Sequence, residues 1–152
     1  MNTKDFGQMQ EVFAYILVLQ NCLQTTFEKT QDNLTLKQWM MLDAVGNTPK
    51  PHTLTNIGLI LGCSRQNAKK IAMTLSKKAY IRLVLGAQNS VNIELTRKGM
   101  EYKKKTTEKH EEILHLLFSH FDEKEMWLFY KHCRTLYMGI EEIEKRFDAT
   151  EI

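Results

Sequence analysis

The part of the sequence that most restricts the fold is a pair of short segments on either side of Gly62. Apolar residues recur at three- and four-residue steps over residues 54–61 and again over residues 65–78. This spacing predicts two short amphipathic helices, and Ser64 is a residue type that commonly caps a helix N-terminus. Glycine permits the sharp turn between the two segments. Together they form a predicted helix-turn-helix.

A predicted β-hairpin follows the second of these helices. Residues 81–85 and 91–95 have the period-two pattern of strands, and the turn sequence GAQNS separates them at residues 86–90. A further helix over about residues 35–45 precedes the pair and ends at the glycine and prolines of GNTPKP. Helix, turn, helix and hairpin in this order predict a winged helix-turn-helix.

Long helices are predicted on both sides of this core. Apolar spacing indicates helices over residues 5–28 and 97–120. The capping signal at Asp122 and Glu125 then begins a final helix that carries a heptad seam. The first helix is apolar around so much of its circumference that we expect burial on several sides. The predicted fold class is mainly α with a small β-hairpin wing.

The charges are segregated along the chain. Residues 61–105 hold eleven Lys or Arg against two acidic residues, a net charge of +9. The rest of the chain holds ten basic and sixteen acidic residues, a net charge of −6. A local excess of this size favours a surface that binds a polyanion, although a solvated face is the plainer alternative.

The segment 65–78 separates its apolar side chains from its basic ones. At 100° per residue, Ala68, Ile71, Ala72 and Leu75 share one side, which we expect to face the core. The opposite side carries amides, which pair with adenine edges, and cations, which pair with guanine edges or phosphates. We therefore predict that this helix lies in the major groove of double-stranded DNA. The predicted DNA-binding residues are Ser64, Arg65, Gln66, Asn67, Lys69, Lys70 and Lys77, with Arg82, Gln88, Asn89 and Ser90 from the wing.

Three stretches resemble the MarR family of bacterial transcriptional regulators. They are LTLKQWMMLDAV at residues 34–45, LTNIGLILGCSRQNAKKIAMTLSKKAYIRLVL at 54–85 and NIELTRKG at 92–99. The order and spacing of the three stretches carry the resemblance. The flanking helices are similar to the family's dimerisation elements by position only.

The resemblance implies a single MarR-like domain over residues 1–152. Residues 34–100 would form its winged helix-turn-helix, and residues 1–33 and 101–152 its helical dimerisation part. The family forms homodimers that bind pseudo-palindromic operators, whereas an intramolecular helix bundle would satisfy the same apolar stripes. The predicted dimerisation residues are Phe6, Met9, Phe13, Phe129, Leu136, Ile140, Ile143 and Phe147.

The resemblance also implies control by a small molecule. Many members bind effectors in a cleft between the two parts, so we predict a ligand-responsive repressor with an aromatic or phenolic effector. Tyr15 and Trp39 are candidates for lining such a cleft, although aromatic residues at helical spacing more often belong to a core.

Two departures from the family pattern affect the site. Ala87 and Asn89 stand where the wing usually carries an Asp-x-Arg pair, so a contact between an arginine and the minor groove is in question. Ala79 stands where glycine often follows the recognition helix. An alanine in a left-handed conformation there would cost about 1 kcal/mol.

Other functions have weaker support. A metal- or redox-responsive regulator of the same fold would use histidines or cysteines, but His110, His115 and His120 do not share a helix face. We expect them to be solvated or to cap helices. Cys22 lies on a helix predicted to be mostly buried, and Cys63 lies in the turn. A protein-interaction module that has lost DNA reading is a third possibility.

The sequence contains no enzyme or cofactor signature, so we expect neither catalysis nor a cofactor. The longest apolar run, residues 12–19, is too short to span a membrane, and the N-terminus has no secretory pattern. The three cysteines do not suggest a disulfide framework. We expect a cytoplasmic protein.

Overall fold

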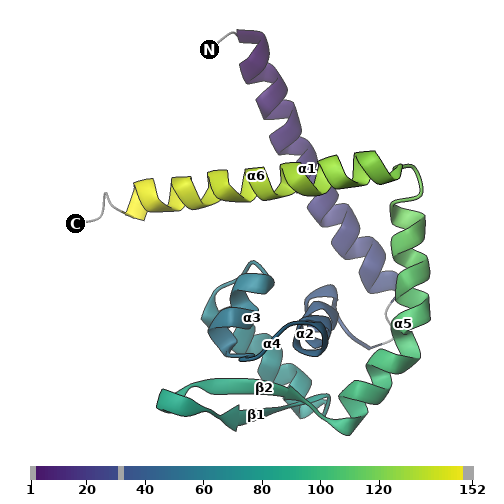
Figure 1. Cartoon of the computed structure of the whole chain (residues 1–152), viewed down its shortest axis with the longest axis vertical. Helices are drawn as coiled ribbons and strands as arrows, with labels where there is room; N and C mark the ends of the chain where they lie inside the picture. Colours follow the sequence, from purple (N-terminus) through teal and green to yellow (C-terminus); the bar gives the residue numbers. More distant parts are fainter. Residues whose placement is uncertain (1–2, 31–32, 149–152) are drawn as a thin grey trace. The chain divides into compact units, whose positions relative to one another are not determined.

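The computed structural model describes residues 3–30 and 33–148, and most of them are helical (Figure 1). The chain divides into two compact units, residues 1–105 and 106–152. The elements in chain order are α1 (Thr3–Thr30), α2 (Leu36–Asn47), α3 (Leu54–Ile60), α4 (Arg65–Lys77), β1 (Ile81–Leu85), the 3-10 turn η1 (Ala87–Asn89), β2 (Val91–Leu95), α5 (Arg97–Leu117) and α6 (Glu123–Asp148). The predicted fold class, mainly α with a hairpin wing, is confirmed.

Side chains cap the three short helices of the first unit. Thr35 and Gln38 form a reciprocal capping box at the start of α2. Thr53 accepts a hydrogen bond from the Asn56 amide at α3, and Ser64 accepts one from the Asn67 amide at α4. Each cap satisfies a backbone N–H group that has no partner within its own helix. The helices therefore begin where the sequence places a hydroxyl.

The turn between α3 and α4 depends on glycine at two positions. Gly62 has a φ of 60°, in the left-handed region that favours glycine. A Cβ atom at Gly58 would lie 2.9 Å from the Cys63 carbonyl oxygen, so any larger residue would push the turn away from α3. These two glycines hold the start of α4 close to the end of α3.

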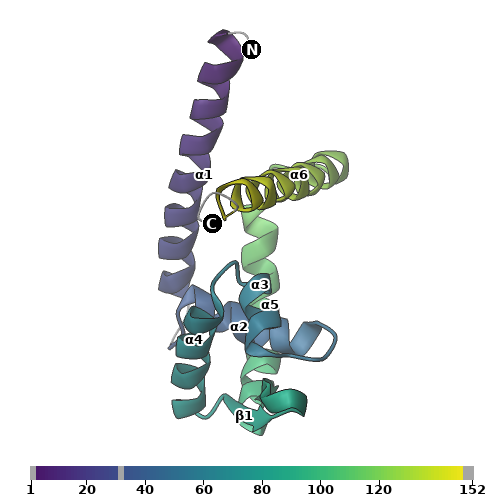
Figure 2. The same ribbon diagram turned by 90° about the vertical axis from the view of Figure 1, so that its left-hand side faces the viewer.

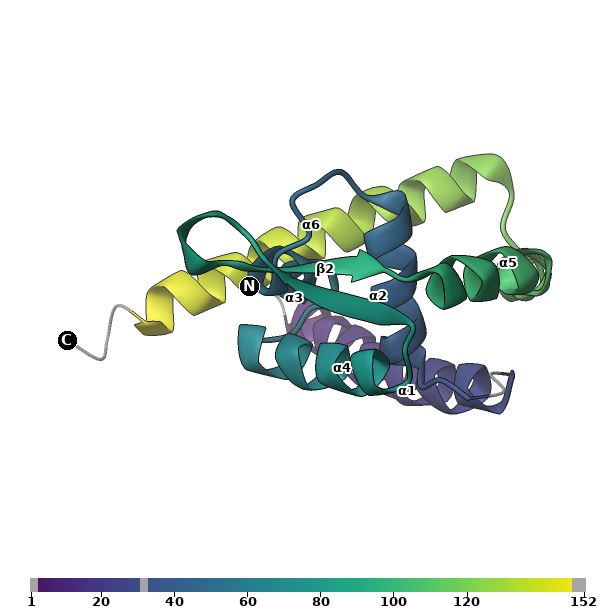
Figure 3. The ribbon, with the colours of Figure 1, turned by 90° about the horizontal axis from the view of Figure 1, so that it is seen from below.

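The predicted hairpin is present, with strands at the predicted positions. Ile81 pairs with Leu95, Leu83 with Ile93, and Leu85 with Val91 in an antiparallel ladder. The tip is tight, because the Gly86 amide donates to the Ser90 carbonyl at 2.7 Å. The hairpin lies alongside α4 when the molecule is seen from below (Figure 3).

One core holds α2, α3, α4 and the hairpin together. Its fully buried members come from every one of these elements: Met41, Leu42, Ile57, Leu75, Ile81 and Ile93. Ala79, after α4, has a φ of 60°, so the left-handed conformation considered from the sequence is present. The Tyr80 amide closes this turn by donating to the Leu75 carbonyl at 3.0 Å.

The expectation that α1 is buried on several sides is wrong for the single chain. Phe6, Met9 and Phe13 are each at least half exposed, and Cys22 is exposed as well. Near the C-terminal end of α1, Phe27 is buried, and its ring lies 6.3 Å from that of Trp39. Figure 2 shows α1 as one uninterrupted helix. The other elements of the first unit therefore leave most of α1 uncovered.

The second unit contains the end of α5 and all of α6. The predicted capping box is present, since the Glu125 amide donates to Asp122 at 2.7 Å and the Asp122 amide donates to Glu125 at 2.9 Å. His110 is buried, contrary to the expectation that it is solvated, whereas His115 and His120 are exposed. No helix in the described ranges is both long and apolar enough to cross a membrane.

Candidate nucleic-acid interface

The two sides of α4 have opposite environments. Ala68, Ala72 and Leu75 have no exposed surface, and Ile71 is half-buried against the same core. All six of the predicted DNA-binding residues within α4 are exposed, namely Arg65, Gln66, Asn67, Lys69, Lys70 and Lys77. The structure thus places these predicted residues together on the outward side of one helix.

Ser64 has a different role from its exposed neighbours. Its hydroxyl oxygen accepts a hydrogen bond from the Asn67 backbone amide at 3.2 Å. The hydroxyl group can still donate its own hydrogen at the first turn of α4, where backbone amides favour an anion. Ser64 therefore fixes the start of α4 and leaves one donor for a ligand.

Nearly half of the basic residues in the segment 61–105 are held by other parts of the chain. The Lys78 ammonium donates to the Asn33 carbonyl at 2.6 Å and to the Gln38 side chain at 3.3 Å. The Lys98 ammonium donates to the Lys78 carbonyl at 2.8 Å and lies over the Tyr80 ring. These lysines join helices to one another.

Three more cations of this segment face acidic groups. Lys103 lies 3.5 Å from the Asp43 carboxylate, and Arg97 lies 2.8 Å from the Glu101 carboxylate. Arg82 is paired in the same way on the wing. Lys103 belongs to a run of three lysines at 103–105, and its ammonium group contacts Asn47 and Asp43 of α2.

Six cations of the segment have no such partner among the described residues. They are Arg65, Lys69, Lys70, Lys77, Lys104 and Lys105. Four of the six lie on the outward side of α4. The uncompensated charge is therefore concentrated on one helix face rather than spread along the basic segment.

The wing contributes one neutralised cation and an uncharged tip. Arg82 donates to the Glu94 carboxylate at 2.7 Å across the hairpin. The antiparallel register of the hairpin places these two residues directly opposite each other. At the tip, Gln88 and Asn89 are exposed with left-handed backbones, and Ser90 is half-buried. The side-chain amides of Gln88 and Asn89 can donate and accept hydrogen bonds.

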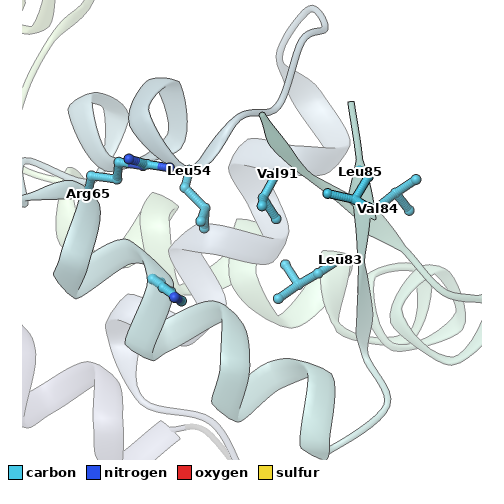
Figure 4. A pocket seen from close by; sticks show the side chains of 7 residues that line it. Leu54, Arg65, Leu83, Val84, Leu85 and Val91 are labelled. Carbon is cyan, nitrogen blue, oxygen red and sulfur yellow. The ribbon is translucent and has the colours of Figure 1, made fainter. Parts of the chain in front are cut away.

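A shallow groove of about 250 Å³ runs between α4 and the hairpin. Its apolar lining comes from Leu54, Leu83 and Val91, whose side chains point into the space in Figure 4, and from the neighbouring Val84 and Leu85. Arg65 and Lys69 form its edge on α4. The groove therefore brings two of the predicted DNA-binding cations beside the wing.

The other candidate sites are less developed. Tyr15 is 68% exposed, and Trp39 is half-buried, with its ring 6.3 Å from that of Phe27. In the part of the chain that the structure describes, no group of three or more His, Cys, Asp or Glu residues is arranged to hold a metal ion.

Comparison with known proteins identifies the fold. No family model matches the chain, and no curated protein matches it. Solved structures do match. A MarR/EmrR family transcriptional regulator from Acinetobacter sp. ADP1 has a TM-score of 0.79 at 19% identity, covering 88% of this chain and 96% of that one.

Two further matches were solved with ligands. FabT of Streptococcus pneumoniae, in complex with DNA, has a TM-score of 0.65 at 20% identity over 89% of this chain and 99% of that one. The transcriptional regulator PcaV of Streptomyces coelicolor, in complex with its natural ligand, has a TM-score of 0.71 at 15% identity. The match covers 81% of this chain and 89% of PcaV. The Acinetobacter and Streptomyces proteins are transcriptional regulators. The chain therefore has the MarR-like winged helix-turn-helix fold, a fold of DNA-binding transcriptional regulators.

The adjacent lysines 77 and 78 allow a matched test of the internal contacts. Lys78→Ala removes two hydrogen bonds to α2 and the segment before it, so we expect a loss of about 1 kcal/mol in the free energy of unfolding. Lys77→Ala removes the same charge at a position without an acidic or carbonyl partner among the described residues. Its free energy of unfolding should stay within about 0.5 kcal/mol of that of the wild type. Urea denaturation measures both. Equal losses of unfolding free energy in the two variants would show that the Lys78 hydrogen bonds do not stabilise the fold.

Proposed function

We propose that this protein binds double-stranded DNA through the outward side of α4. The observation that carries the proposal is the cluster of four uncompensated cations on a helix whose other side packs against the core. Phosphates attract such a cluster strongly, because binding releases the counterions condensed on the duplex. The fold of the DNA-bound FabT structure supports the same partner.

The amide and cationic side chains near the start of α4 would recognise the DNA base sequence. Residues at the N-terminal end of a recognition helix enter the major groove most deeply. Gln66 and Asn67 suit adenine edges, whereas Arg65 suits guanine, and Lys69, Lys70 and Lys77 suit phosphates. The Gln88 and Asn89 amides and the Ser90 hydroxyl at the wing tip would make weaker contacts beside the groove. Arg82 would contribute little while Glu94 neutralises it.

We further propose a homodimer. The predicted dimerisation residues of α1 and α6 are all at least 43% exposed in the single chain, at helical spacing along both helices. Apolar surface in such continuous stripes is rarely left in water, since each covered Å² contributes roughly 25 cal/mol. A second copy presents the same stripes. Two copies of α4 would then occupy successive major grooves about 34–36 Å apart on a pseudo-palindromic operator.

The finer role we propose is that of a cytoplasmic repressor released by a small molecule. The structure of PcaV with its natural ligand supports a ligand-responsive role for this fold. An effector releases DNA only if it binds the DNA-free conformation more tightly, and the coupling is reciprocal. Tyr15 and Trp39 remain our candidates for contacting an aromatic or phenolic effector.

The salt dependence of DNA binding tests the face of α4. For a mixed-sequence duplex of about three helical turns, the wild-type affinity should fall steeply between about 50 and 200 mM salt. Lys70→Ala removes two phosphate contacts per dimer, so the logarithmic salt slope should become shallower by about two. Lys124→Ala, on α6, is the matched control and should leave the slope unchanged. Fluorescence anisotropy measures each slope. A Lys70→Ala slope equal to that of the wild type would refute this interface.

The dimer is tested by placing a charge in the α6 stripe. Ile140→Glu should shift the protein to monomers, because a carboxylate buried between two copies costs several kcal/mol. The same variant should bind DNA more weakly, since the two α4 helices no longer act together. Glu141→Gln, one residue away, should leave the dimer intact. Sedimentation equilibrium reports both states, and an unchanged dimer in the Ile140→Glu variant would show that α6 is not the interface.

The effector proposal is tested with a panel of phenolic and aromatic acids. A compound that acts as effector should weaken DNA binding and should itself bind more weakly, by the same factor, when DNA is present. Tyr15→Phe and Trp39→Phe should lower the affinity for that compound while leaving the affinity for DNA near that of the wild type. Isothermal titration gives both affinities. If neither substitution changes the affinity for the compound, the two aromatic residues do not line its site.

A further inference from the structure

One apolar side chain lies on the otherwise polar outward side of α4. Met73 is 45% exposed, and it is the sole exposed apolar residue of this helix, all of which the structure describes. Gln66, Lys70, Met73 and Lys77 follow one another at steps of four, three and four residues. This spacing places them within about 60° of arc, along the centre of the outward side.

The fold does not need a methionine at this position. The packing of α4 is provided by Ala68, Ala72 and Leu75, which lie on the opposite side and are fully buried. The neighbouring Thr74 hydroxyl donates to the Lys70 carbonyl at 3.1 Å, so it is turned toward its own helix. Met73 therefore extends outward between two lysines, where no part of the first unit requires an apolar group.

The chemistry of the major groove indicates what Met73 would contact. Base edges there present hydrogen-bond donors and acceptors, and a single apolar group, the C5-methyl of thymine. A methionine side chain is unbranched and polarizable, so it adapts readily to a small apolar partner. We propose that Met73 is a specificity-determining residue that selects thymine by packing on its C5-methyl group. This inference rests on the proposed DNA-binding function.

The helix geometry gives the position of that thymine. Met73 lies seven residues after Gln66, which is about 10 Å along a helix that rises 1.5 Å per residue. That length spans at most about three base pairs, each of which rises 3.4 Å along the duplex axis. Each half-site should therefore carry a thymine within about three base pairs of the base that Gln66 contacts. The same methyl group occurs on 5-methylcytosine, so the test must separate the methyl from the rest of the base.

The first experiment selects binding sites from random-sequence duplexes. The wild type should enrich one thymine per half-site at the expected distance from the Gln66 position. Met73→Leu keeps an apolar side chain and should retain this thymine. Met73→Gln has a similar length but a polar end, and it should lose the thymine preference while enriching the rest of the site. Because Met73 is half exposed, both variants should melt close to the wild-type temperature.

The second experiment removes only the methyl group. Deoxyuridine in place of the selected thymine in both half-sites should weaken wild-type binding by about fourfold per half-site, the effect of one buried methyl group. Two further duplexes carry cytosine or 5-methylcytosine in place of the selected thymine. The wild type should bind the 5-methylcytosine duplex more tightly than the cytosine duplex. The Met73→Gln variant should bind the thymine and uracil duplexes equally.

The outcomes separate this inference from the function on which it rests. Sequence-selective binding by the wild type with equal affinity for thymine and uracil duplexes would overturn the role of Met73 and leave DNA binding intact. Retention of the methyl effect in Met73→Gln would overturn it in the same way. Failure of the wild type to bind any duplex at low salt would overturn both.

Discussion

The packing of the apolar side of α4 determines which of its residues are able to meet a partner. Ala68 and Ala72 are small enough to bring α4 close to its neighbours, and Leu75 fills the core beneath it. A rotation of α4 by one residue, about 100°, would turn lysines toward this core, where an unpaired charge is very costly. The packing that stabilises the unit therefore also presents Gln66 and Lys70 to the outside.

Charge acts in two ways in this protein. Lys78, Lys98 and Lys103 use their ammonium groups inside the first unit, where they reach backbone carbonyls and side chains of other elements. The cations of α4 have no such partners among the described residues, so their charge remains available to a polyanion. Lysine thus connects the elements of the first unit, and on α4 it would attract DNA under the proposed function.

Much of this fold was predictable because its signals are local. Helix caps such as Ser64, the left-handed Gly62 and the alternation within the hairpin each depend on a few adjacent residues, and the structure agrees with them. The outward side of α4 followed from its spacing alone. The lysine contacts within the first unit could not be predicted in this way. Lys78 and Asn33, for example, are 45 residues apart, and no sequence pattern relates them.

The exposed stripes of α1 and α6 mark the limit of reasoning from one chain. Their apolar spacing predicts burial, yet Phe13 is exposed in the first unit and Ile143 is exposed in the second. The sequence gives the side that must be covered but not the surface that covers it. The proposed dimer would cover these stripes and would also bring two copies of α4 to one duplex.

The most direct test of the central claim, that the outward side of α4 enters the major groove, is methylation interference with dimethyl sulfate. This reagent modifies guanine N7 in the major groove and adenine N3 in the minor groove, so a single experiment reports on both. The account predicts interference at guanine N7 in two patches about 34–36 Å apart on one side of the duplex. Interference confined to adenine N3 would contradict it.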